Sequence, residues 1–227
     1  MDHPIILHIN TALNRAYVGL SNGENTLAML ENENPMDHAA FLQPAIKELL
    51  KKTGLPLSSI QAVSVINGPG SYTGLRVGLS AAKGICYAMN IPLICINTLE
   101  WLASSVKIKN PDMVCAMIDA RRMEVYTSMY DDQMNCTMDP MAMILDENSF
   151  QESLSKHQIA FVGNGAEKWK SISQSSHAIF PEGDSNIKEQ IKLTLKHWSL
   201  QAFCNLAYVE PFYVKDFYSP SLYMKKQ

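Results

Sequence analysis

The chain has 227 residues, of which 47% are hydrophobic and 18% are charged, and its formal net charge is −3. This length and apolar content suffice for one large α/β domain or two small ones and exclude a disordered chain. The small negative charge argues against a protein that holds nucleic acid alone, because phosphate binding depends on clustered Lys and Arg.

The cysteines and the N-terminus indicate a compartment. Five cysteines, an odd number without CxxC spacing, favour free thiols in a reducing environment over a disulfide framework or a zinc site. The first residues lack a basic stretch followed by an apolar run, and no segment is long and apolar enough to span a bilayer. We therefore expect a cytoplasmic protein.

The first half of the chain predicts three strands, then a helix, then a strand–helix–strand unit and a further helix. In chain order these elements are 5–10, 16–20 and 26–30 (strands), 36–52 (helix), 60–66 (strand), 72–89 (helix), 92–97 (strand) and 97–106 (helix). The tight turns between the first three strands predict an antiparallel meander. The strand–helix–strand unit predicts a parallel, right-handed crossover.

The second half repeats this order. Its predicted elements are 113–118, 124–130 and 138–145 (strands), 148–156 (helix), 159–162 (strand), 166–172 (helix) and 186–207 (helix). A repeated meander-plus-helix plan is typical of actin-like and sugar-kinase-like α/β proteins with mixed sheets, the ribonuclease-H-like fold class. We expect one module over 1–106 and a second over 107–227, whose last helix and tail pack back on the first.

The segment 68–78 is rich in glycine and lies between a predicted strand and a predicted helix, where exposed amides suit an anion. Its spacing nevertheless fails three catalytic templates. No glycine is followed by Gly-Lys-Ser/Thr at Walker spacing, and Thr73 stands where a dinucleotide loop needs its third glycine. Pro69 and Thr73 occupy the glycine positions of a nucleophile elbow around Ser71.

The helix that follows carries small residues at every fourth position, namely Gly74, Gly78 and Ala82. Glycine in a helix costs up to about 1 kcal/mol relative to alanine, so this pattern implies close packing. The strip packs either within the fold or against a subunit that docks beside the helix 36–52. Arg76 stands near the helix start, where a cation is unfavourable, which predicts a carboxylate partner for it, either inside the chain or across an interface.

At this point the chain resembles the TsaB family. The resemblance rests on Asn67–Gly78 (NGPGSYTGLRVG), Ala81, Lys83, Gly84, Ile91-Pro92, Thr98-Leu99, Ile118–Arg122 (IDARR), Glu124–Tyr126 (EVY), His38, Leu42, Pro44, Ile46 and Leu49-Leu50, with weaker matches at Gly163–Ala166 and Pro211–Lys215. It covers nearly the whole chain.

The resemblance implies a non-catalytic, actin-like paralogue of the catalytic subunit TsaD that helps to form threonylcarbamoyladenosine beside the anticodon of ANN-reading tRNAs. It implies TsaD-type and TsaE-type partners, a homodimer through the same surface, and tRNA contact only through partners. ATP and metal are expected on the partner subunits, with no cofactor, metal or catalytic residue here. The implied interface residues are His38, Leu42, Ile46, Leu49, Tyr72, Leu75, Arg76, Gly78, Leu79, Ala82 and Lys83.

Two enzyme readings stand as alternatives. An actin-like ATPase or carbohydrate kinase would use the cleft between the modules, but Asn10 stands where relatives have an Asp and cannot act as a base. A serine hydrolase with Ser71, Asp119 and His157 conflicts with the elbow spacing. The histidines also lack the His-x-x-x-His metal pair of the catalytic subunit, and Lys215 replaces the usual Arg of the tail.

Overall fold

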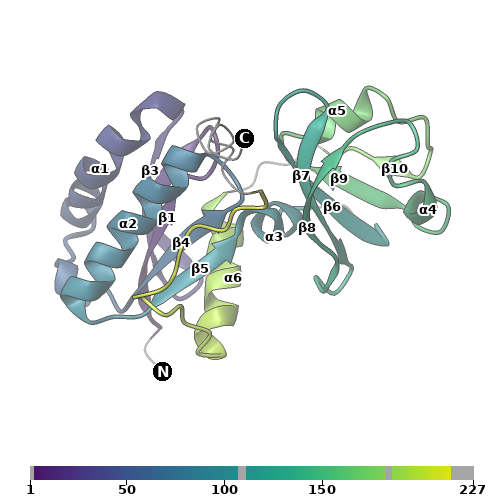
Figure 1. Cartoon of the computed structure of the whole chain (residues 1–227). Helices are drawn as coiled ribbons and strands as arrows, with labels where there is room; N and C mark the ends of the chain where they lie inside the picture. Colours follow the sequence, from purple (N-terminus) through teal and green to yellow (C-terminus); the bar gives the residue numbers. More distant parts are fainter. Residues whose placement is uncertain (1–2, 107–110, 182–185, 216–227) are drawn as a thin grey trace.

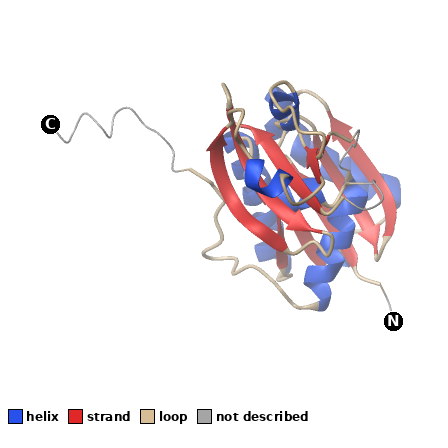
Figure 2. Cartoon of the chain, turned by 90° about the vertical axis from the view of Figure 1, so that its right-hand side faces the viewer, coloured by secondary structure: helices blue, strands red, loops and turns tan. Residues whose placement is uncertain are grey.

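The computed structural model describes residues 3–106, 111–181 and 186–215. Two five-stranded sheets, each flanked by helices, form two modules joined by the segment after α3 (Figures 1 and 2). This confirms the predicted mixed α/β class. Within the described residues, no helix is both long and apolar enough to cross a lipid bilayer.

The first sheet has the strand order β3-β2-β1-β4-β5. Its strands are β1 (Ile5–Asn10), β2 (Ala16–Asn22), β3 (Asn25–Asn32), β4 (Ala62–Gly68) and β5 (Leu93–Asn97). The first three are antiparallel, as the tight turns predict, and β4 and β5 add in parallel to β1. Helices α1 (His38–Thr53) and α2 (Tyr72–Met89) cover one face of this sheet (Figure 1).

The second sheet repeats this topology in the order β10-β9-β6-β7-β8. Its strands are β6 (Met113–Asp119), β7 (Glu124–Asp131), β8 (Cys136–Ile144), β9 (Ile159–Val162) and β10 (Ala178–Ile179), and two short helices, α4 (Gln151–Leu154) and α5 (Ala166–Lys170), follow β8 and β9. The repeated order predicted from the sequence, an antiparallel meander followed by a parallel strand, is therefore present in both sheets.

The two modules exchange a helix. Helix α3 (Thr98–Ala103) follows the first sheet but contacts β6 and β7 of the second, whereas α6 (Ile187–Ser199) follows the second sheet and packs on β5, β1 and β2 of the first. One hydrophobic cluster consequently runs through both modules and includes Trp101, Val114 and Ile191. A separate core lies between the first sheet and helices α1 and α2.

Several predicted boundaries are wrong. Helix α6 ends at Ser199 instead of 207, because Leu200 is its C-cap and Gln201 has a positive φ of 52°. Helices α3 and α4 are shorter than predicted, and the two-residue strand β10 was not predicted. After α6, the C-terminal segment (200–215) runs irregularly back across β5 and α2, where Cys204 donates its backbone N–H to the Leu93 carbonyl.

Candidate functional site

The glycine-rich turn before α2 is closed by the chain's own backbone. Ser71 donates its backbone N–H to the Ala12 carbonyl at 2.7 Å, and a Cβ on Gly70 would lie 2.3 Å from the same oxygen. Gly68 has a φ of 121° and would clash with the Phe212 carbonyl if it carried a side chain. The Ser71 hydroxyl caps α2 by accepting the Gly74 N–H at 3.3 Å. These contacts use the glycines for close packing, which agrees with the failure of the phosphate-loop templates.

The small-residue strip of α2 faces the sheet. A Cβ on Gly74 would lie 2.0 Å from the Thr11 carbonyl oxygen, and one on Gly78 would lie 2.4 Å from the Thr11 hydroxyl. Ala82 is fully buried in the core beneath the helix. Of the two interpretations of this strip, the structure supports packing within the fold.

Eight of the eleven expected interface residues are likewise buried in this chain. They are His38, Leu42, Ile46, Leu49, Leu75, Gly78, Leu79 and Ala82. Apart from His38, whose ring bonds the Asn14 carbonyl at 3.2 Å, and Gly78, they are apolar side chains of the core. These side chains therefore pack the two helices on the sheet, and they offer little surface of their own to a partner.

The remaining three, Tyr72, Arg76 and Lys83, reach solvent beside the C-terminal segment. Arg76 has no carboxylate partner among the described residues, so of the two expected positions for one, only a position across an interface stays a prediction. Its Nε donates to the Tyr213 hydroxyl at 3.1 Å, and its guanidinium carbon lies 4.1 Å from the centre of the Tyr72 ring. Lys83 donates to the Val209 carbonyl at 3.0 Å. These contacts hold the C-terminal segment on α2.

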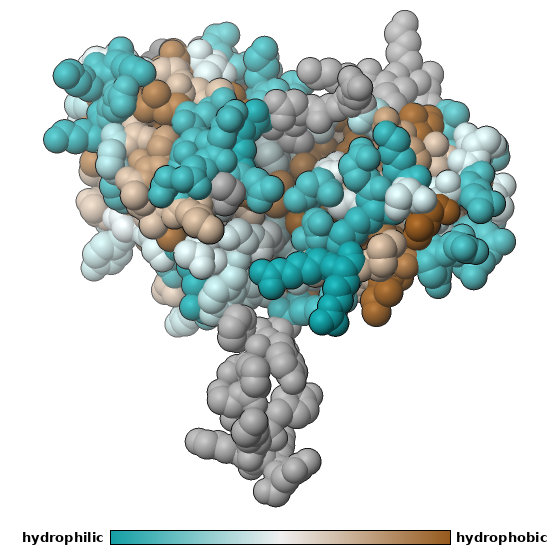
Figure 3. All heavy atoms as spheres, turned by 90° about the horizontal axis from the view of Figure 1, so that it is seen from above, coloured by the Kyte–Doolittle hydropathy of each residue, from teal (hydrophilic) through white to brown (hydrophobic). Residues whose placement is uncertain are grey.

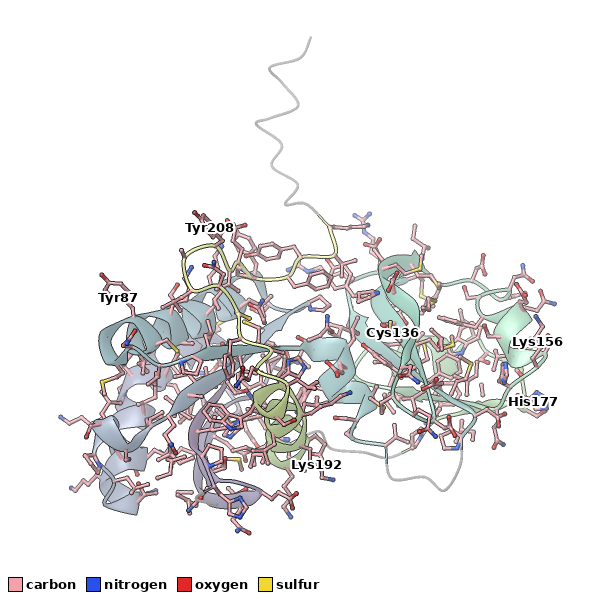
Figure 4. All side chains as sticks on the ribbon, turned by 90° about the horizontal axis from the view of Figure 1, so that it is seen from below. Tyr87, Cys136, Lys156, His177, Lys192 and Tyr208 are labelled. Atoms are coloured by element: carbon pink, nitrogen blue, oxygen red, sulfur yellow. The ribbon has the colours of Figure 1, made fainter. Side chains whose placement is uncertain are left out.

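Beside Arg76 and Lys83, the solvent-facing side of α2 carries a stripe of uncharged residues, which we call the outer face of α2. It consists of Thr73, Val77, Ser80, Ala81, Gly84, Tyr87 and Ala88. Tyr87 is 83% exposed and points away from the body of the module (Figure 4). Among the residues that the structure describes, no atom lies within 4 Å of a Cβ built on Gly84, so packing within this part of the chain does not require a glycine there. Sequence reasoning missed this face because the spacing of small residues does not show which side meets the sheet.

The cleft between the modules lacks a catalytic constellation among its described residues. Asn10 is fully buried and its Oδ1 accepts the Ala12 N–H at 3.0 Å, a structural role. Asp119 pairs with Lys168 at 2.7 Å, and this lysine holds the pKa of the Asp119 carboxyl below its usual range. The carboxylate therefore orients no histidine. Within the described ranges, no group of three His, Cys, Asp or Glu side chains could hold a metal ion.

The hydrolase reading also fails on distance within the fold. Ser71 lies at the start of α2 in the first module, whereas His157 follows α4 at the far side of the second module (Figure 1). The two side chains cannot form a nucleophile–base pair, because that pair needs a direct hydrogen bond.

The duplicated strand order and the exchanged helices define an actin-like, two-module α/β protein. A family model described as TsaD, tRNA N6-adenosine threonylcarbamoyltransferase, matches residues 33–195. The tRNA threonylcarbamoyladenosine biosynthesis protein TsaB of Escherichia coli K12 is 30% identical over 185 residues, which are 79% of each chain. The TsaB of Bacillus subtilis 168 is 30% identical over 125 residues, or 55% of this chain and 54% of that one.

A solved structure agrees with the fold. A Pseudomonas aeruginosa protein described as similar to the peptidase YEAZ superposes with a TM-score of 0.81 at 22% identity, covering 93% of this chain and all of that one. The chain belongs to the TsaB family, whose members act in tRNA threonylcarbamoyladenosine biosynthesis.

Proposed function

We propose that this chain is a non-catalytic subunit that binds and activates a TsaD-type threonylcarbamoyltransferase, which forms threonylcarbamoyladenosine beside the anticodon of ANN-reading tRNAs. The observation that carries the proposal is the outer face of α2, with its exposed Tyr87 and its unexplained Gly84. Interfaces are depleted of charge at their centres and use tyrosine as an anchor. A glycine on the surface of a helix lets a second helix approach closely.

The same face would serve a homodimer of the isolated chain, since both uses need an uncharged surface. A TsaE-type ATPase completes the proposed assembly, and ATP and metal belong to the partners. Absence of independent catalysis is part of the proposal. Its support is the structural use of Asn10, the Asp119–Lys168 pair and the closed turn at Ser71.

Light scattering of the purified chain mixed with its cognate TsaD-type subunit tests the assembly. We expect a stable heteromer at micromolar concentration, and its loss in Tyr87→Glu and Gly84→Arg, which alter only exposed positions. Leu200→Glu, at a site that is 68% exposed beyond α6, is the matched control and should assemble normally. Absence of a complex, or equal assembly by the Tyr87 and Gly84 variants, would refute the proposal.

Activation is tested separately by threonylcarbamoyl transfer to tRNA with and without this chain. The ATPase or carbohydrate-kinase alternative is tested by ATP turnover of the chain alone. Sustained turnover that Asn10→Ala abolishes, with the fold retained by circular dichroism, would favour that alternative.

A further inference from the structure

A groove of about 630 Å³ lies between the β6–β7 turn and the C-terminal segment, and the docking proposal does not use it. Three cations, Arg121, Arg122 and Lys215, line it together with a single carboxylate, Glu124. Four aromatic rings also line it, those of Tyr72, Tyr126, Phe212 and Tyr213. Viewed from above, hydrophilic residues gather between the two modules (Figure 3). The three cations of the groove outnumber its one carboxylate, so positive charge is concentrated here on a chain whose net charge is −3.

The two arginines of the turn are held outward by the backbone. Arg121 and Arg122 have positive φ values of 72° and 49°, and both side chains are exposed. Neither guanidinium forms an ion pair with any residue in the described ranges. The nearby Asp119 is already paired with Lys168. A left-handed backbone at two successive non-glycine residues is strained, and strain of this kind concentrates at functional sites.

The aromatic wall of the groove is organised around Tyr213. Its ring lies 5.5 Å from that of Tyr72 at an interplanar angle of 31°. The Arg76 guanidinium stacks on the Tyr72 ring and donates a hydrogen bond to the Tyr213 hydroxyl. On the opposite side Lys215 pairs with Glu124, which ties the C-terminal segment to β7. Phe212 is 40% exposed. An exposed ring, that of Phe212, thus lies in the same groove as the exposed side chains of Arg121 and Arg122, beside the partly exposed tyrosines.

Cations that follow a groove and aromatic faces that accept bases are the two elements of single-stranded nucleic-acid binding. An acidic peptide would use the cations but not the rings. We propose that this groove binds unpaired RNA and gives the chain its own contact to the tRNA substrate of its family. This revises the expectation that tRNA is reached only through partners, and it does not depend on the docking role of the outer face of α2.

Fluorescence anisotropy of the full chain with a fluorescein-labelled single-stranded RNA of about twelve nucleotides tests the proposal. We expect saturable binding. With the three cations of the groove engaged, the affinity should fall about 20-fold between about 50 and about 200 mM salt, since each single-strand phosphate contributes a slope of about −0.7.

The variants separate the two elements of the groove. Arg121→Glu/Arg122→Glu should weaken binding at least about tenfold and reduce the salt slope, whereas Tyr213→Leu should weaken binding with the slope unchanged. Lys188→Glu/Lys192→Glu is the matched control, because it makes the same change in net charge at exposed sites on α6 (Figure 4 shows Lys192) and should stay within about twofold of wild type. Circular dichroism confirms that each variant is folded.

Three results would overturn the proposal. They are no saturable binding by the wild type, an equal loss in the α6 control, and competition by AMP or polyglutamate as strong as competition by unlabelled RNA. Assembly of the arginine variant with a TsaD-type subunit, followed by light scattering, should be unchanged. A failure of RNA binding is therefore distinguishable from a failure of the docking proposal.

Discussion

The hydroxyl of Thr11 occupies the space that a side chain on Gly78 would need. It donates to the Gly74 carbonyl at 2.6 Å, and a Cβ on Gly78 would lie 2.4 Å from it. Gly78→Ala should therefore lower stability, because overpacking costs about 1–3 kcal/mol and exceeds the gain of up to about 1 kcal/mol in helix propensity. Urea unfolding followed by circular dichroism measures the change. An unchanged midpoint would contradict the packing of α2 described above.

Gly84→Ala, one and a half turns further along α2, should have the opposite effect. Its Cβ meets no atom within 4 Å, so only the helix propensity changes, and the isolated chain should gain about 0.5–1 kcal/mol in the same urea experiment. Destabilisation at this site would show that Gly84 has a structural role in the monomer. The docking proposal would then lose one of its two supports.

Acid should destabilise the fold through His8. This ring is fully buried, its Nε2 bonds the Ser21 hydroxyl at 2.9 Å, and burial lowers its pKa to about 3. Because the folded pKa lies below the unfolded value of about 6.5, the unfolded state takes up the extra proton, and stability falls as the pH drops from about 6.5 towards 3.

The size of this effect can be isolated with His8→Gln, whose amide can still reach Ser21. Between pH 7.5 and pH 5.5 the unfolding free energy of the wild type should fall by about 1.4 kcal/mol more than that of the variant. This is the free energy of one pKa unit, because pH 5.5 lies about one unit below the pKa of the unfolded histidine. Urea midpoints at the two pH values measure the difference. Equal pH dependence in the two proteins would show that His8 does not titrate on unfolding.

Helix α6 is fastened to the first sheet by a buried polar contact between Ser64 and Thr194. Their hydroxyl oxygens lie 2.7 Å apart, and the Gln190 amide also donates to Ser64. A double-mutant cycle of Ser64→Ala and Thr194→Val should give a coupling energy of about 0.5–1.5 kcal/mol in thermal or urea unfolding. Additive effects would show that the Ser64–Thr194 contact itself does not help to hold α6 on the sheet.

Elements with strong end signals were predictable from the sequence. The bounds of α2 agree at both ends, where the Ser71 hydroxyl caps the first turn and Asn90 adopts the left-handed conformation. The end of α6 was not predictable, since no glycine or proline marks Leu200 as the point where the helix stops. Strand β10 has only two residues, which is too short for a recognisable alternation.

The sequence indicated that α2 packs closely on one side, but it did not show which of its residues are exposed. The spacing of Gly74, Gly78 and Ala82 correctly indicates close packing on one side of α2. Whether that side meets a sheet or a partner depends on Thr11, which is more than 60 residues away in the chain. The stacking of Tyr72 and Tyr213 likewise joins distant segments. Long-range contacts of this kind leave no periodic trace in a single sequence.

The placement of α6 has a consequence for the order of events during synthesis. The first sheet is complete in sequence at Asn97, yet the face that α3 covers in part is completed only by a helix that begins at Ile187. The second sheet, Met113 to Ile179, emerges from the ribosome in the interval. The part of the chain that is translated first is therefore the last to bury its apolar surface.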